Sequence, residues 1–114
     1  MDSILTTIKT MLGIVATATE FDQILIAHIN SVFAILQQLG VGPKNGFAIT
    51  GSGETWSNFI SGDPYTLRDV KTYIYLKVKL MFDPPQNSAV LTSYTNLCSE
   101  FEFRLNVAVD PKED

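Results

Sequence analysis

The chain has 114 residues, of which 46% are hydrophobic and 18% charged, and its formal net charge is -4. This length fits one domain with a single core, which needs neither a metal ion nor disulfides to fold. The acidic balance argues against a dedicated nucleic-acid binder, because such proteins usually present a basic face. The charged fraction is below the roughly 25% of an average soluble domain, which is typical of a small protein that buries surface in an oligomer.

The single cysteine, Cys98, excludes an intrachain disulfide and fits a reducing compartment. It is in helical phase with Leu91, Tyr94 and Phe101, so we expect it to be a small buried residue. The N-terminus lacks the pattern of a signal peptide, and the apolar runs are far shorter than the roughly 20 residues of a membrane span. We therefore expect a soluble protein that is made and used without export.

The first half of the chain predicts two helices joined by a linker at residues 14–19. The first helix covers residues 3–12, with Asp2 or Ser3 as its cap and Gly13 as its stop. The second opens at the acidic residues Glu20 and Asp22 and ends at Gly40. Its apolar stripe is Leu25, Ile29, Val32, Leu36 and Leu39, widened by Ile26 and Phe33, so we expect it to be central.

Residues 40–64 change in texture, with glycines at 40, 42, 46, 51, 53 and 62 and prolines at 43 and 64. Irregular loops above roughly 12–15 residues are usually functional or disordered. Within this one, residues 47–50 could form a short strand and residues 55–60 a single helical turn. We expect Trp56, Phe59 and Ile60 to anchor the loop to the core.

Two further helices follow, over residues 67–82 and 88–107, separated by a turn at Pro84-Pro85. The third helix is apolar almost all round, so it lies either at the centre of a bundle or against a partner chain as well. The sequence thus predicts one all-α domain over residues 1–114, a small bundle of four main helices. A long anchored loop with a possible short strand or hairpin joins helices two and three, and residues 108–114 form a polar, mobile tail.

The residues suited to chemistry are scattered. His28 is the one histidine and is expected to be a hydrogen-bonded structural residue at the flank of the second helix. The acids Asp63, Asp69 and Asp83 are separated by helix or turn, and the glycines of residues 51–55 lack the lysine ending of a phosphate-binding loop. We expect no catalytic activity, no metal and no cofactor.

Several blocks of sequence resemble small bacteriophage proteins, the head–tail connector or head-completion proteins that form the neck of long-tailed phages. The blocks are HINSVFAILQQLGVGP at 28–43, ETW at 54–56, VKTYIYLKVKLMFDPPQNSAVL at 70–91 and SEFEFRLNVAVD at 99–110. The resemblance spans most of the chain and keeps the order and spacing of the blocks.

This resemblance implies a non-enzymatic, all-helical subunit of a homo-oligomeric ring, usually dodecameric, in the virion neck. Such a ring assembles in the bacterial host cytoplasm, docks below the portal protein and offers its far face to the next neck or tail-completion protein. Double-stranded DNA passes through the channel without sequence-specific binding, which the acidic balance suits. Some relatives contact the portal through a C-terminal extension, whereas the tail here is short.

A ring predicts head-to-tail contacts between two different faces of each subunit. We expect the third helix to build one face and residues 47–60 the other. The candidate interface residues are Phe47, Ile49, Trp56, Phe59, Tyr73, Tyr75, Leu76 and Leu80. Trp56 has two readings, an interface hot spot or a loop anchor within the monomer. Under the first reading, Trp56→Ala weakens assembly and leaves the isolated subunit helical.

Two other classes of function fit the residues less well. A small phage-encoded regulatory protein that acts by protein contact would more often show a basic recognition helix after a short connection. A small hydrolase would need a nucleophile and a base in one pocket, for which a lone histidine is thin support.

Overall fold

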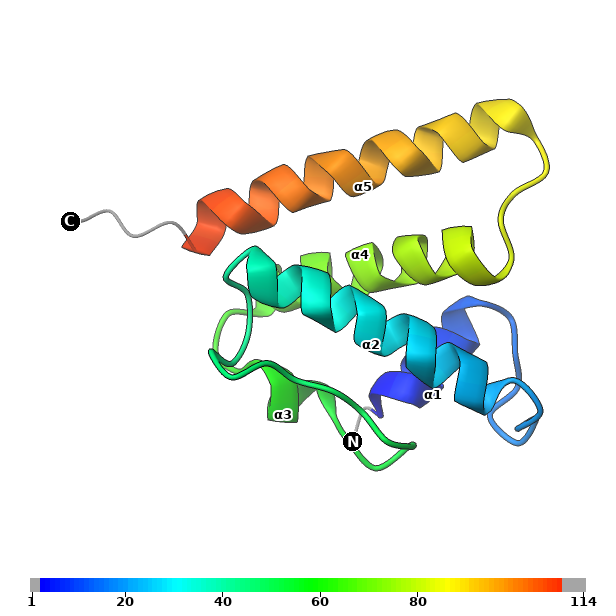
Figure 1. Ribbon diagram of the computed structural model, residues 1–114, viewed down its shortest axis with the longest axis horizontal. Coiled ribbons are helices and arrows are strands. Elements are labelled where there is room, and N and C mark those ends of the chain that lie inside the picture. Colours follow the sequence, from blue (N-terminus) through cyan, green and yellow to red (C-terminus); the bar gives the residue numbers. More distant parts are fainter. Residues whose placement is uncertain (1–2, 110–114) are drawn as a thin grey trace.

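The computed structural model describes residues 3–109, which form helices joined by loops (Figure 1). The helices in this part of the chain are α1 (Ile4–Met11), α2 (Asp22–Gln38), α3 (Trp56–Phe59), α4 (Pro64–Phe82) and α5 (Ser88–Val109). No β-strand occurs within residues 3–109, which confirms the all-α class. The last residues of the predicted tail, 110–114, lie outside the described part of the chain, and α5 runs to Val109.

The helix α4 occupies the centre of the molecule. The helix α5 lies along one side of the bundle, α2 and α4 form the middle, and α1 and α3 lie on the other side (Figure 1). Because neighbours cover α4 from both sides, most of the apolar residues in its middle are buried within the chain. The buried residues of this helix are Val70, Tyr73, Ile74, Leu76 and Val78.

Local capping chemistry sets where the helices begin. Ser3 caps α1 by accepting a hydrogen bond from the Thr6 amide at 3.2 Å. The helix α4 begins three residues earlier than predicted, at Pro64, because proline is well suited to the first helical position. The Asp63 carboxylate caps it by accepting from the Tyr65 amide at 3.0 Å and from the Thr66 hydroxyl at 2.7 Å.

The predicted strand at residues 47–50 is wrong. A side chain of α2 takes the place of a partner strand: Ile49 N–H donates to Asn30 Oδ1 at 2.8 Å, and Asn30 Nδ2 donates to the Ile49 carbonyl at 3.0 Å. One asparagine thus satisfies both backbone groups of buried Ile49, which removes the need for a β-ladder.

The long loop is ordered by aromatic anchors, as predicted. Its single helical turn is α3, and Trp56 and Phe59 of that turn are buried. The ring of Phe59 packs with Phe33 of α2 and with Phe47, at centroid distances of 4.7 and 5.4 Å. Gly42 permits this packing, since its φ is +92° and a Cβ there would lie 2.4 Å from the Phe59 ring.

A buried lysine holds the connection between α1 and α2. The Lys9 side chain, 2% exposed, donates from Nζ to the carbonyls of Ala16 at 3.0 Å and Ala18 at 2.6 Å. Its Nζ also lies 2.8 Å from Asp22 Oδ1, an otherwise unpartnered oxygen at the start of α2. The predicted linker is therefore folded around an internal charge.

Removing this charge is expected to destabilise the subunit. Lys9→Ala leaves the Asp22 carboxylate and two backbone carbonyls without their donor, so we expect the free energy of unfolding to fall by about 2–3 kcal/mol. The expected loss is smaller than that for breaking a fully buried ion pair, because the Asp22 side chain is 23% exposed. Urea denaturation measures the loss, with the exposed Lys44→Ala as the matched control. Equal stability of the two variants would contradict the anchoring role.

Candidate functional site

The residues suited to chemistry serve the fold. Residues 3–109 contain no group of three or more histidine, cysteine or carboxylate side chains placed to hold a metal ion. Asp63 caps α4, Asp83 pairs with Lys79 at 2.9 Å, and Asp69 lies beside an arginine. His28 is half-buried on α2, and its structural hydrogen bond stays a prediction. Cys98 is buried as predicted, and burial raises the pKa of its thiol.

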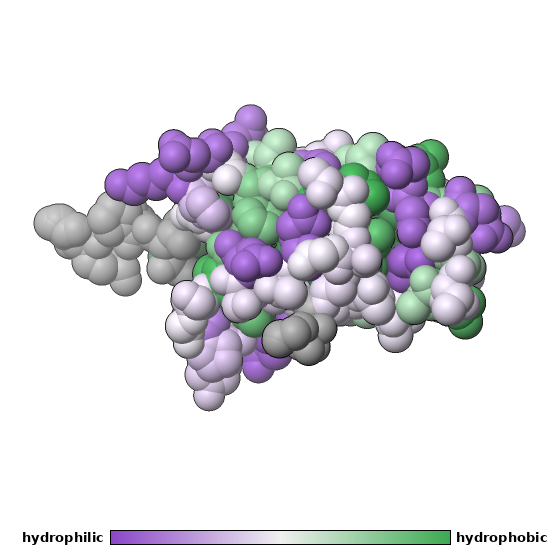
Figure 2. Space-filling model, turned by 90° about the horizontal axis from the view of Figure 1, so that it is seen from below, coloured by the Kyte–Doolittle hydropathy of each residue, from purple (hydrophilic) through white to green (hydrophobic). Residues whose placement is uncertain are grey.

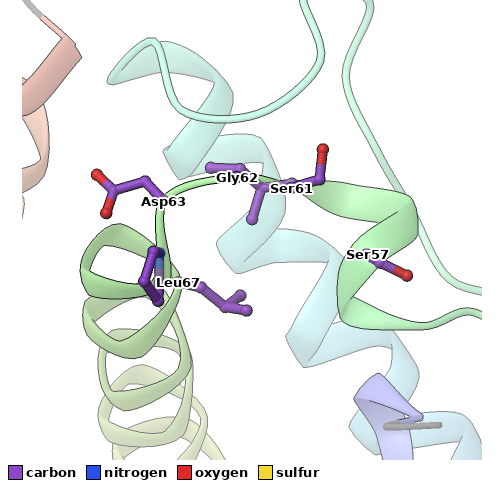
Figure 3. Close-up of a pocket in the computed structure, with 7 residues that line it drawn as sticks. Ser57, Ser61, Gly62, Asp63 and Leu67 are labelled. Atoms are coloured by element: carbon purple, nitrogen blue, oxygen red, sulfur yellow. The ribbon is translucent and has the colours of Figure 1, made fainter.

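A hollow of about 320 Å³ lies between α3 and the start of α4, and we call it the α3–α4 hollow (Figure 3). Figure 3 shows the Leu67 side chain beside it, while the Asp63 carboxylate and the Ser57 and Ser61 hydroxyl groups point away from Leu67. Polar groups therefore do not converge on one point, as they do where a substrate is held and activated. The lining residues are Ser57, Ile60, Ser61, Gly62, Asp63, Pro64 and Leu67.

The predicted interface residues mostly lie inside the subunit. Five of them belong to its core: Ile49, Trp56, Phe59, Tyr73 and Leu76. Phe47, Tyr75 and Leu80 are half-buried and pack against that core. The structure thus gives the buried five a packing role within the chain, and any contact with a partner stays a prediction.

Burial of Trp56 favours the loop-anchor reading. Its side chain is 2% exposed, its Nε1 donates to the Thr7 hydroxyl of α1 at 3.0 Å, and Lys71 lies over its ring at 5.5 Å. The residue therefore joins α3 to both α1 and α4.

A polar contact inside the α4–α5 interface links the two longest helices. The Tyr73 hydroxyl donates to Glu102 Oε2 at 2.7 Å, and Lys77 Nζ lies 4.0 Å from the same oxygen. Burial of the phenol, followed by the nearby Glu102 carboxylate, raises the pKa of Tyr73 far above its ordinary value near 10. The neutral, donating hydroxyl is thus the form that the folded chain stabilises.

Apolar side chains are also exposed along α5 and at one end of the bundle. On α5 the exposed residues are Val90, Leu91, Leu97, Phe103 and Val107. At the end where α2 begins and α4 finishes, they are Met11, Val15, Phe21, Ile24 and Met81, which we call the end patch. Figure 2 shows hydrophobic residues reaching the surface at this end, on the right.

One sequence signal could have revealed the exposed side of α5. Phe101 and Phe103 are two residues apart, so a helix cannot direct both toward α4. Phe101 is half-buried and Phe103 is 70% exposed.

This all-helical domain has a complete core and still exposes large apolar side chains, which is typical of a protein that contacts other proteins. The comparisons with known proteins agree. The family model of the phage connector proteins matches residues 4–112, so the chain belongs to the phage connector protein family.

No curated protein and no solved structure gives a significant match. Membership of a connector family supports a structural role in a phage, in association with portal or tail proteins. Across residues 3–109, the helices fall short of the length and hydropathy that crossing a bilayer requires.

Truncation of Trp56 is expected to destabilise the monomer itself, in contrast to the outcome expected from sequence. Trp56→Ala removes a buried ring and a hydrogen-bond donor, so we expect a loss of about 3–5 kcal/mol in the free energy of unfolding. Trp56→Phe keeps a ring and is expected to lose about 1–2 kcal/mol. Circular dichroism during urea denaturation separates the two, and a wild-type midpoint for Trp56→Ala would refute the anchor reading.

The raised pKa of Tyr73 makes stability depend on pH. Below about pH 10 the protonated hydroxyl contributes to stability, and that contribution is lost at higher pH because the tyrosine of the unfolded chain ionises first. Tyr73→Phe is expected to lower the free energy of unfolding by about 1 kcal/mol at pH 7. Above about pH 10 the stability of this variant should decrease less steeply than that of the wild type. Urea midpoints from pH 8 to 11 test this. The exposed Tyr65→Phe is the control and should parallel the wild type.

Proposed function

We propose that this protein is a structural subunit of a ring in the phage neck, which docks under the portal and joins the DNA-filled head to the tail. The observation that carries the proposal is the match of the connector family model to residues 4–112. The surface adds support, because large apolar side chains remain exposed after the core of the subunit is complete. Such side chains are typical of a subunit that is covered by neighbours in its working state.

The ring needs lateral contacts between subunits and axial contacts with the portal and the next neck or tail-completion protein. Of the residues predicted for the lateral contacts, half-buried Phe47, Tyr75 and Leu80 have surface to offer directly. The five buried candidates would contribute indirectly, because their packing fixes the positions of the side chains on that surface. The end patch, at one extremity of the bundle, has the exposure that an axial contact needs.

Charge supports the passage of DNA through such a ring. The chain carries 12 acidic and 8 basic residues, so a ring of identical copies is strongly acidic as a whole. An acidic lumen would repel the phosphate backbone and let double-stranded DNA leave without binding. We propose no sequence-specific contact with DNA.

The ring itself is the first thing to measure. We expect light scattering of the purified protein, alone or mixed with the portal protein of its phage, to give a mass many times that of one chain. Negative-stain images should then show a closed ring, dodecameric as in similar connectors, with a central channel. A monomer that stays monomeric in the presence of the portal would overturn the proposal and favour a small regulatory protein.

A further inference from the structure

The most exposed large apolar side chain in the described part of the molecule is Phe103. It is 70% exposed and lies on the side of α5 that faces away from α4, while Cys98 and Leu105 of the same helix are buried against the bundle. Val107, one turn further on, is 46% exposed, so the two residues form a continuous apolar spot on the outer side of α5. An exposed phenyl ring of this kind is typical of the anchor residue of an interface.

The α3–α4 hollow has the size and lining to receive such a ring. Its volume of about 320 Å³ exceeds the roughly 150 Å³ of cavities that are known to bind benzene. Ile60, Pro64 and Leu67 supply apolar lining, and the polar side chains of the rim point away from Leu67 (Figure 3). The hollow therefore suits an apolar side chain better than a polar ligand.

The two features lie on different sides of one subunit. The helix α5 runs along one side of the bundle, whereas α3 lies on the other side, with α2 and α4 between them (Figure 1). Head-to-tail contacts that close into a ring require two different, complementary surfaces on each copy. A protrusion on α5 and a hollow beside α3 meet that requirement.

The charges next to the two features complement each other. Glu100 and Arg104, both about half exposed, flank Phe103 on α5 and pair with each other at 3.2 Å. The hollow is flanked by the exposed Asp63 and by Arg68, whose side chain is 68% exposed. Arg68 already lies 3.6 Å from Asp69, and Asp63 caps α4. Each side thus carries exposed charges of both signs, and an exchange of partners would let Glu100 pair with Arg68 of the neighbour and Arg104 with its Asp63.

We propose that Phe103 of one copy of this chain inserts into the α3–α4 hollow of the next copy and forms the lateral contact of the assembly. The contact rests on the proposed ring function and adds the residues that join one subunit to the next. It differs from the predicted contact because α5 supplies one of the two faces. The other face, the hollow, includes Ser57 and Ile60 of the predicted 47–60 face and Leu67 of the third helix.

Cysteine cross-linking of the full-length protein tests the contact. The double variant Phe103→Cys with Ser61→Cys should form disulfides between copies under mild oxidation and give a ladder of covalent oligomers on a non-reducing gel. Each single variant should stay monomeric on that gel, because a head-to-tail contact brings position 103 to position 61 and not to itself. The native Cys98 is buried and is present in all variants as an internal control. The matched control is Val15→Cys with Ser61→Cys, since Val15 is 66% exposed but lies at the end patch.

A charge placed at the same position gives a second readout. Phe103→Asp, at a site that the monomer leaves exposed, should keep wild-type urea stability and weaken association by about tenfold or more. A wild-type ring without a ladder in the double variant would overturn the contact and leave the proposed function standing. Absence of any ring from the wild type, with or without the portal, would overturn the proposed function and the contact with it.

Discussion

A helix with apolar residues on nearly every side has to be enclosed, and the arrangement of this bundle follows from the enclosure of α4. The helix α2 covers one flank, α5 covers another, and α1 also packs against α4. The aromatic anchors of the long loop complete the core beside α2 through the cluster of Phe33, Phe47 and Phe59. Because α4 buries its middle within the chain, the surface available to partners comes from its two ends, where Tyr65 and Met81 are exposed, and from the elements that surround it.

Helix positions and the all-α class could be predicted from the helical spacing of apolar residues and from the prolines and glycines that end helices. The Pro84-Pro85 corner, the glycine stops and the 3.6-residue apolar spacing are local signals that need no knowledge of the fold. The turn at Trp56–Phe59 was equally visible, since its apolar residues interrupt a polar loop. The strand expected at residues 47–50 failed for a physical reason. Alternating residues report that a segment is half-buried, but they cannot say whether a strand or the Asn30 side chain will satisfy its backbone.

The candidate site was harder to predict, because hydrophobicity does not separate core from interface. Trp56 and Tyr73 satisfied every criterion for a contact residue, and the fold uses them to join helices to one another. Phe103 was passed over because it stands outside the main stripe of α5, which is the reason that it reaches the surface. Identification of the family depended on the sequence as a whole, whereas the surfaces that it uses depend on which side chains the fold leaves uncovered.

The buried lysine of α1 has a consequence for recognition. Lys9 binds the carbonyls of Ala16 and Ala18, so the short segment that carries Val15 has little conformational freedom left to lose. Flexible loops pay an entropic penalty when a partner orders them, and a loop that is already fixed avoids it. The buried charge of Lys9 thus keeps the end of the subunit that carries Val15 rigid, so a partner can bind that end without first having to order it.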